Sequence, residues 1–362
     1  MLCYGVSFLT NTIKNCWITL NRQCNLRCKW CYAAGTKYKS EDEMDIKDFL
    51  RILDFLNAQN IKKVTLMGGE PTCYNNLLKA INLCNEHGID TVLVTNGIKL
   101  ADANLVMQLQ QAGLTRLNLS LKGYDNNDFM SITGVDGFHI ALAAIKNISE
   151  SDIPFTVSMV LSSDNIHGFI KGVTAAKAAG AEHFSFSFRY DFSVLNNKVR
   201  VIDRYDFEKN IFGVIDEFIN QYSELCKVLK NNFTLAQSFP LCAWPEEFIM
   251  HMASKLELRS VCQLLRHSGL IFDIDFRVIP CNAMYQISLG KFGEDFNSSD
   301  FGLYWNSARI KEIFNKLRSV PSIKCNSCKW LNVCGGGCVS HWFNFTFEEF
   351  EQARDFHFAN KA

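Results

Sequence analysis

The chain has 362 residues, a length that favours one large domain and a smaller one. It is 48% hydrophobic and 20% charged, which is typical of a globular protein. Its 37 Lys and Arg residues equal its 37 Asp and Glu residues, so no overall field attracts nucleic acid or an anionic membrane. No apolar run approaches the roughly 18 residues of a membrane span, and the N-terminus does not resemble a signal peptide. We therefore expect a cytoplasmic protein with neither a nucleic-acid nor a membrane partner.

The first half of the chain alternates apolar, β-rich runs with amphipathic helical patterns. Most of the apolar runs are continuous, which is typical of parallel strands buried on both faces. The predicted strands cover residues 17–21, 64–67, 91–95, 116–121, 155–161 and 184–188. The predicted helices cover residues 47–59, 75–87, 102–112, 138–148, 168–179 and 205–229. Six strand–helix units predict an α/β fold, a partial (β/α)6 TIM-like barrel.

The composition changes near residue 235. From about Pro240 the chain becomes irregular and cysteine-rich, and it ends in an aromatic, acidic tail. We therefore predict two domains, a partial barrel over residues 1–235 and a small cysteine-rich domain with a C-terminal tail over residues 236–362.

The chain carries 15 cysteines, and a clustered, odd set in a reducing compartment indicates metal binding. Cys24, Cys28 and Cys31 directly follow the first predicted strand, where barrel folds place their chemistry. Three thiolates suit three corners of a [4Fe–4S] cluster, which leaves the fourth iron free for a small molecule. The alternatives are three buried cysteines or part of a zinc site, although a structural zinc site normally has four ligands.

This C-x3-C-x-aromatic-C run, with Trp30 in the aromatic position, resembles the signature of the radical S-adenosylmethionine (SAM) superfamily. The resemblance implies that the open iron binds SAM and that the cluster cleaves it to a 5′-deoxyadenosyl radical, which abstracts hydrogen from a substrate. The sequence Gly68-Gly69-Glu70-Pro71 matches the GGEP element of the family, whose main chain binds the methionine amino group of SAM. Paired glycines permit close approach of a ligand.

The ends of later strands fit the same resemblance. Asn96 ends the third strand, and Ser120 ends the fourth at the position of the family's S-L-D-G serine, near the SAM carboxylate or ribose. Lys122 replaces the family's acidic residue, so its role stays open. Arg189 and Tyr190 follow the sixth strand and are either contacts to SAM or substrate, or ordinary polar residues of the barrel rim.

A C-x2-C-x5-C-x3-C run near the C-terminus resembles the core of the SPASM extension, which binds auxiliary iron–sulfur clusters in radical SAM enzymes. Its members are Cys325, Cys328, Cys334 and Cys338. Cys281 ends a segment similar to the family's D-x-D-G-x-x-x-P-C, with Phe276 in place of glycine.

The resemblance implies one or two auxiliary clusters with crossed ligands. The first three cysteines of the run hold the second cluster, and the first cluster takes Cys242, Cys262, Cys281 and Cys338. No cysteine follows Cys338, so the fourth ligand of the second cluster stays open among His341, Asp355, His357 or an open site. A zinc ribbon on the four cysteines of the run is the alternative.

Together these motifs predict a radical SAM oxidoreductase that matures a ribosomally synthesised peptide by crosslinking, oxidation or epimerisation. The expected partners are a peptide or protein substrate and a flavodoxin- or ferredoxin-type electron donor. Only 23 residues precede Cys24, so we expect either a separate leader-peptide recognition protein or direct binding by the barrel. The catalytic base stays open among Asp191, Asp273, Asp275 and Tyr285.

Three other functions compete with this one. An anaerobic sulfatase-maturase-like oxidase would carry an aspartate directly after the cysteine that matches Cys281, but this chain has Asn282. A small-molecule radical SAM dehydrogenase is also compatible with the motifs. An iron–sulfur or zinc scaffold without turnover would not need the intact GGEP element.

Overall fold

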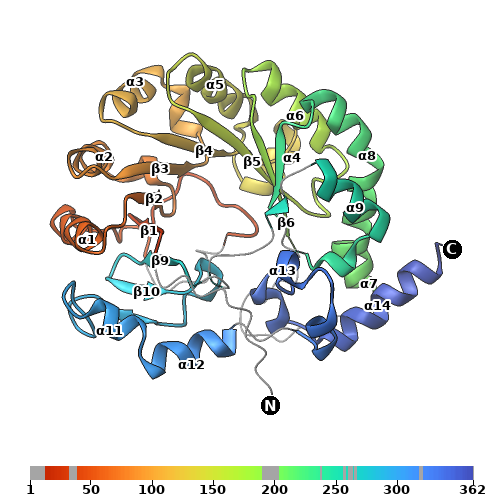
Figure 1. The fold of residues 1–362 in the computed structure, drawn as a ribbon. Helices are drawn as coiled ribbons and strands as arrows, with labels where there is room; N and C mark the ends of the chain where they lie inside the picture. Colours follow the sequence, from red (N-terminus) through yellow and green to blue (C-terminus); the bar gives the residue numbers. More distant parts are fainter. Residues whose placement is uncertain are drawn as a thin grey trace.

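The computed structural model describes residues 13–31, 39–189, 204–236, 239–255, 258–259, 264, 267–317 and 321–361. Its fold is a curved sheet with helices along its outer face, an open barrel in which the C-terminal segments lie next to the first strand (Figure 1). Asp191, Tyr190 and Cys262 lie outside the described residues.

The predicted parallel strands are observed, with ends that differ by at most two residues from the prediction. They are β1 (Asn15–Thr19), β2 (Lys63–Met67), β3 (Asp90–Thr95), β4 (Arg116–Ser120), β5 (Phe155–Leu161) and β6 (Phe184–Phe188). Each pairs in parallel with the next along the chain. Their C-terminal ends therefore meet at one rim of the barrel, so the loops that follow them can share a site.

Helices connect these strands and cover the outside of the sheet. They are α1 (Ile46–Ala58), α2 (Leu77–Glu86), α3 (Ala103–Gln111), α4 (Asn126–Thr133), α5 (Phe138–Ser149) and α6 (Phe169–Ala178), with short 3-10 turns η2 (Pro71–Cys73) and η3 (Ile98–Ala101). The predicted helix 205–229 is observed as α7 (Arg204–Phe207), the π-helical η4 (Glu208–Phe212) and α8 (Gly213–Leu229). The sequence pattern did not predict α4, because its eight residues, NNDFMSIT, are mostly polar.

The sheet is wider than the six strands predicted from the sequence. On the β6 side it gains β7 (Phe233–Ala236) and β8 (Leu258–Arg259), which are both parallel. On the β1 side it gains the parallel β9 (Gly269–Phe272), then the antiparallel β10 (Arg277–Ile279) and β11 (Gly290–Lys291). The described residues thus form one eleven-stranded sheet, in the order β11-β10-β9-β1-β2-β3-β4-β5-β6-β7-β8. The predicted domain boundary at residue 235 falls inside β7, and strands from both sides of it belong to this sheet.

The remaining C-terminal segments are short helices and turns. They are η5 (Leu241–Ala243), α9 (Glu246–Lys255), η6 (Asn282–Met284), α11 (Phe301–Trp305), α12 (Ala308–Leu317), η7 (Ile323–Ser327), α13 (Leu331–Cys334), η8 (Val339–Phe343) and α14 (Phe347–Ala359). Figure 1 shows α11 and α12 below β9 and β10, while α13 and α14 lie near α7.

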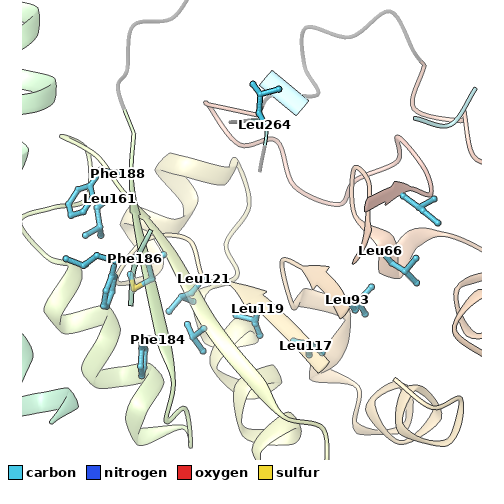
Figure 2. Packing of buried hydrophobic residues seen from close by; sticks show 14 of the residues in the cluster. Leu66, Leu93, Leu117, Leu119, Leu121, Leu161, Phe184, Phe186, Phe188 and Leu264 are labelled. Carbon is cyan, nitrogen blue, oxygen red and sulfur yellow. The ribbon is translucent and has the colours of Figure 1, made fainter. Parts of the chain in front are cut away.

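The core is continuous across the predicted boundary. Leu66, Leu93 and Leu117, on successive strands, are fully buried between the sheet and its helices (Figure 2). Phe55, on α1, contacts aromatic rings that all come from the C-terminal half, with centroids 5.0–6.0 Å apart: Phe272, Phe292, Phe296 and Phe301. Because such rings bury large apolar areas, this cluster joins the end of the chain firmly to its beginning.

Among the described residues, no single helix is long and apolar enough to cross a membrane, although the bent pair α4 and α5 passes on length and composition alone.

Candidate metal centre

The loop after β1 brings three thiols together at the rim of the barrel. Cys24, Cys28 and Cys31 are half-buried, and the Leu26 amide donates to the Cys24 sulfur at 3.4 Å. Burial is the main cause that raises the pKa of the Cys24 thiol to about 11, and the neighbouring Cys28 and Cys31 thiols contribute to this rise. The three thiols are therefore close enough to interact electrostatically. Their charged forms therefore need a cation or a metal beside them.

Helix α4 supports the middle of this cysteine loop. The Arg27 amide donates to the Thr133 carbonyl at 2.8 Å, and the Lys29 amide donates to the Ile132 carbonyl at 2.9 Å. The Lys29 ammonium also donates to the Ser131 hydroxyl at 3.0 Å. The C-terminal turn of α4 therefore fixes the backbone between the first and third cysteines.

The GGEP segment contacts the start of the cysteine loop. A Cβ atom on Gly69 would lie 2.4 Å from the Arg22 and Gln23 carbonyl oxygens. The Gly69 amide donates to the Asn21 carbonyl at 2.8 Å, and the Glu70 amide donates to the Gln23 carbonyl at 2.7 Å. The glycines therefore also allow the chain that leads into Cys24 to approach closely, and their contact with a ligand stays a prediction.

Glu70 is a buried anchor between two strand ends. Its carboxylate accepts hydrogen bonds from the Thr72 amide (3.0 Å) and hydroxyl (2.7 Å), the Thr95 hydroxyl (2.6 Å) and the Asn96 amide (2.7 Å). These bonds tie the end of β2 to the end of β3 and satisfy the buried charge. Pro71 follows at the start of η2. The Asn96 side chain continues the network toward the cysteines, because it donates to the Asn25 side chain at 2.8 Å and lies 3.9 Å from the Cys24 sulfur.

Ser120 and Lys122 place a positive charge beside the cysteines. The Lys122 ammonium donates to the Ser120 hydroxyl at the end of β4. Burial lowers the pKa of Lys122, while the nearby Cys28 and Cys31 act to raise it. Conversely, Lys122 acts to lower the pKa of Cys28, which burial raises. The lysine that replaces the family's acidic residue therefore lies where it compensates thiolate charge.

Arg189 and Trp30 meet across the mouth of the barrel. The Arg189 guanidinium carbon lies 5.2 Å from the centre of the Trp30 ring, within the range of a cation–π interaction. Arg189 follows β6, whereas Trp30 belongs to the cysteine loop after β1. Two residues that were predicted separately as SAM contacts thus form one contact.

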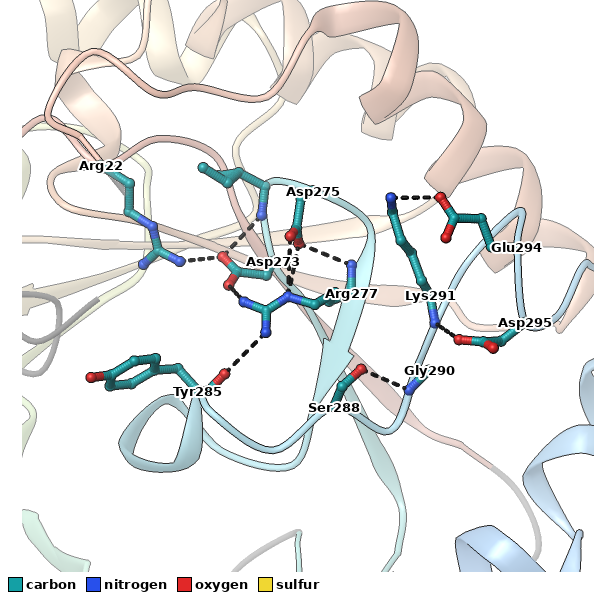
Figure 3. Close-up of polar contacts among 11 residues, drawn as sticks. Arg22, Asp273, Asp275, Arg277, Tyr285, Ser288, Gly290, Lys291, Glu294 and Asp295 are labelled. Carbon is teal, nitrogen blue, oxygen red and sulfur yellow. Dashed lines mark hydrogen bonds and ion pairs between the residues drawn. The ribbon is translucent and has the colours of Figure 1, made fainter. Parts of the chain in front are cut away.

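Two of the predicted bases belong to an ion-pair network (Figure 3). The fully buried Asp273 pairs with Arg22, just before the cysteine loop, and with Arg277 at 3.3 Å. Asp275 pairs with Arg277 at 3.1 Å. The Tyr285 carbonyl accepts a hydrogen bond from Arg277 at 3.3 Å, and the Tyr285 ring extends away from the network. These contacts give Asp273 and Asp275 a structural role as partners of arginine, which argues against either acting as a base.

Cys281 lies near the end of β2. The side-chain amide of the next residue, Asn282, donates to the Met67 sulfur at 3.5 Å, and Met67 directly precedes Gly68. A cysteine of the C-terminal half therefore lies close to the GGEP segment.

The cysteines of the C-terminal run, together with Cys242, form a second group. Cys325 lies on η7, Cys328 lies in the turn after it, and Cys334 ends α13. Cys242 lies on η5, beside them. The Cys338 sulfur lies 3.0 Å from the Ser340 hydroxyl. Of the suggested fourth ligands, His357 has both ring nitrogens engaged, by Glu208 at 2.8 Å and by Asp216 at 3.3 Å. Asp355 pairs with Arg354 at 2.7 Å.

The first group of thiols fits a [4Fe–4S] cluster with an open corner. No three His, Cys, Asp or Glu side chains in the described part of the chain converge on a point that one metal ion could occupy. A cubane cluster does not require this, because each thiolate binds its own iron corner. Three thiols on one loop, N–H groups directed at sulfur and the Lys122 charge match this donor set. The fold and the site therefore define an open α/β barrel with a three-cysteine cluster loop at the carboxyl rim.

The family comparison agrees with this class. Residues 18–171 match the model of the Radical SAM superfamily, so this part of the chain is assigned to that superfamily of enzymes. Two curated relatives are called probable GTP 3′,8-cyclase. The one from Thermococcus kodakarensis is 31% identical over 163 residues, which are 44% of this chain and 52% of that protein. The one from Pyrococcus abyssi is 32% identical over 149 residues, which are 41% and 48%. The chain thus spans about half the length of the curated relatives it matches.

The solved structures extend the similarity over nearly the whole chain. SuiB from Streptococcus suis, bound to S-adenosylmethionine, matches with a TM-score of 0.65 and 20% identity over 91% of this chain and 74% of SuiB. The protein anSMEcpe with bound AdoMet matches with a TM-score of 0.65 and 18% identity over 95% and 96%. Two further structures contain a peptide. SuiB bound to precursor peptide SuiA matches with a TM-score of 0.65 and 19% identity over 91% of this chain and 73% of SuiB. The protein anSMEcpe with bound AdoMet and Cp18Cys peptide matches with a TM-score of 0.62 and 18% identity over 95% and 98%. At these identities the likeness shows a shared fold, which includes the cysteine-rich C-terminal part.

Proposed function

We propose that this chain is a radical SAM enzyme that modifies a peptide or protein and that it matures a ribosomally synthesised peptide in the cytoplasm. The supporting observation is the extent of the shared fold. It covers 91–95% of the chain in proteins whose structures contain AdoMet or a peptide. The likeness to GTP 3′,8-cyclases covers only 41–44% of the chain.

In this proposal Cys24, Cys28 and Cys31 hold a [4Fe–4S] cluster, which with bound SAM supplies a 5′-deoxyadenosyl radical. The residues around it have separate tasks. Lys122 and Ser120 offer a cation and a hydroxyl to the carboxylate of SAM, because both lie at the end of β4 beside the cysteines.

The contact between Arg189 and Trp30 lies beside the cysteine loop, where it would shield this side of the rim from water. The substrate peptide enters at this rim. A flavodoxin- or ferredoxin-type protein supplies the electron, and the C-terminal cysteines hold one or two auxiliary clusters.

A second candidate function is hydrogen abstraction from a nucleotide. It is favoured by the 31% identity to the Thermococcus protein over 163 residues. The sulfatase-maturase-like reaction is less favoured, because Asn282 stands where that reaction needs an acid and is bound to Met67.

Deuterium transfer distinguishes the two functions. Protein reconstituted anaerobically with iron and sulfide would be given SAM, dithionite and one deuterated candidate substrate at a time. The candidates are peptides encoded by short reading frames beside the gene and GTP deuterated at C3′. We expect deuterium in 5′-deoxyadenosine, together with a changed peptide mass, from a peptide. Deuterium from GTP and from none of the peptides would contradict the proposal.

A further inference from the structure

The segment before α9 lies directly against the C-terminal cysteines. The Leu241 amide donates to the Cys334 sulfur at 3.2 Å. A Cβ atom on Gly337 would lie 2.9 Å from the Pro240 nitrogen, so the two backbones touch. Glu246 also pairs with Lys329, between Cys328 and Cys334. Contacts of Pro240 and Leu241 before Cys242, and of Glu246 after it, therefore hold η5 against the turn that carries the cysteine run.

Backbone amides hold Cys334 from two sides. The Leu241 amide donates to its sulfur at 3.2 Å, and the Gly337 amide donates to its carbonyl at 3.0 Å. Gly336 and Gly337 adopt φ values of 82° and 79°, a left-handed conformation that favours glycine. Successive N–H groups in such a turn form a concave anion site, which suits a thiolate bound to iron.

Four thiols form a connected group around this turn. Cys242 follows Leu241, whose amide donates to the Cys334 sulfur at 3.2 Å. The Cys242 thiol interacts electrostatically with the Cys334 and Cys325 thiols, and Cys325 interacts in the same way with Cys334 and Cys328. Arg354 hydrogen-bonds to the Cys242 thiol, so a cation lies beside it. Cys242 therefore lies among the three thiols for which the sequence resemblance left a fourth ligand open.

We propose that Cys242 is the fourth thiolate ligand of an iron–sulfur cluster held by Cys325, Cys328 and Cys334. This replaces the wiring implied by the resemblance, in which Cys242 served the other auxiliary cluster with Cys338. Residues 339–362 contain no cysteine, and both ring nitrogens of His357 are engaged by carboxylates. The other auxiliary site then keeps the thiolates of Cys262, Cys281 and Cys338.

An iron–sulfur cluster fits this group better than zinc. A zinc ion needs four sulfurs at about 2.3 Å from one point. The described residues contain no set of three ligands that converges in this way. The corners of a cubane cluster lie apart, so thiolates carried by η7, α13 and η5 do not need to converge on one point to hold it.

Pairwise cysteine replacement tests the assignment. The background is the full-length chain with Cys24, Cys28 and Cys31 changed to Ala, so that only auxiliary metal remains. Three single changes are added to this background: Cys242→Ala, Cys328→Ala and Cys338→Ala. Two double changes combine Cys242→Ala with Cys328→Ala or with Cys338→Ala. Iron, sulfide and zinc per chain and the EPR spectrum of the reduced protein are measured after anaerobic reconstitution. Cys226→Ala is the matched control, because Cys226 is a half-buried thiol on α8, away from the cysteine run.

We expect Cys242→Ala and Cys328→Ala to remove the same EPR signal and about four irons each, and the pair to remove no more. Adding Cys338→Ala to Cys242→Ala should remove further iron. Cys242→Ser, which keeps a ligand atom, should retain iron with a shifted EPR signal, which separates ligand loss from misfolding. The assignment is overturned if Cys242→Ala keeps all auxiliary iron, or if Cys242→Ala and Cys338→Ala remove the same iron and the same EPR signal. It is also overturned if one zinc per chain is bound in place of this iron.

Discussion

Gly69 determines how closely the cysteine loop can lie against the end of β2. A methyl group at this position would lie 2.4 Å from two backbone carbonyl oxygens, and backbone cannot move aside as a flexible side chain can. Gly69→Ala should therefore displace the loop and destabilise the protein by about 1–3 kcal/mol. It should also remove most of the iron bound by Cys24, Cys28 and Cys31. Thermal unfolding and the EPR signal of the SAM-binding cluster measure both effects.

The control for this prediction is Gly302→Ala. Nothing lies within 4 Å of a Cβ atom on Gly302, so the change should be neutral or stabilising by about 0.5–1 kcal/mol. If Gly69→Ala melts with the wild type and keeps its iron, the tight contact between the two segments is not required.

Asp128 gives the protein a local pH dependence. Burial raises the pKa of this half-buried carboxyl on α4 from 3.8 to about 6, and the nearby Asp125 adds to the rise. The folded state therefore binds more protons than the unfolded state between about pH 4 and pH 6, so the stability contributed here falls as the pH rises through this window. Partial exposure limits the effect to about 1–2 kcal/mol. Asp128→Asn should remove this loss, so its melting temperature should exceed that of the wild type more at pH 7.5 than at pH 5.

Asp125 provides a control of opposite sign. Its pKa is lowered by hydrogen bonds from the Asp128 amide and from Lys171, so its contribution is present above the unfolded pKa and is lost on acidification. Asp125→Asn should therefore cost more at pH 7.5 than at low pH. Equal pH profiles for both variants and the wild type would contradict the assignment.

At the scale of elements, β9 and the start of the cysteine loop depend on one buried ion pair. The side chains of Arg22 and Asp273 are 5% and 0% exposed, and Arg277 supports Asp273 from the other side. Asp273→Asn keeps the shape but removes the carboxylate that pairs with Arg22, while Arg277 keeps its pair with Asp275. Because removing one partner of a buried ion pair is costly, we expect a loss of about 3–5 kcal/mol and faster removal of cluster iron by a chelator.

Glu312→Gln is the matched control for this change, because it breaks an exposed pair with Lys316 at 2.8 Å. Exposed pairs contribute little, so its melting temperature should stay close to that of the wild type. If Asp273→Asn costs no more than Glu312→Gln, the ion pair does not hold the loop.

Elements with strong local patterns could be predicted from the sequence, and those defined by pairing alone could not. Strands such as β5 and β6 were predicted residue for residue, because their apolar runs end at clear turns. The strands β8 and β11 have two residues each, which carry no periodicity.

Phe276 stands where the family motif has glycine, yet it adopts the left-handed conformation, with φ at 66°. Its ring lies 4.7 Å from the Arg51 guanidinium and packs on Phe292, contacts that help to offset the strain.

The candidate site shows the same division. The cysteine, GGEP and serine motifs could be located because each follows a predictable strand. The partners of those residues could not, because they come from distant parts of the sequence. Examples are the pair of Arg22 with Asp273 and the contact of Leu241 with Cys334.

At the scale of the whole molecule, the sheet that carries the first cysteine loop also contains strands from the C-terminal half. Strand β1 leads into the cysteine loop, and it is paired on one side with β2 and on the other with β9 from the C-terminal half. The turn after β9 carries Asp273, whose carboxylate binds Arg22, and β10 leads to Cys281. The C-terminal half is therefore part of the framework that positions the first cluster loop, in addition to carrying the second set of thiols.

This arrangement predicts that residues 1–236 do not fold alone, although the sequence placed a domain boundary there. Such a fragment leaves β1 without β9, Arg22 without Asp273 and Phe55 without its four aromatic neighbours. An exposed parallel edge strand with an apolar face favours aggregation. We expect the fragment to be aggregated or to show fast hydrogen exchange at the β1 amides and no cluster on Cys24, Cys28 and Cys31. A chain that ends at residue 359, after α14, should exchange and bind iron like the full chain. If residues 1–236 instead remain monomeric with protected β1 amides and bind about four irons, the barrel is an independent domain and β9 only decorates its edge.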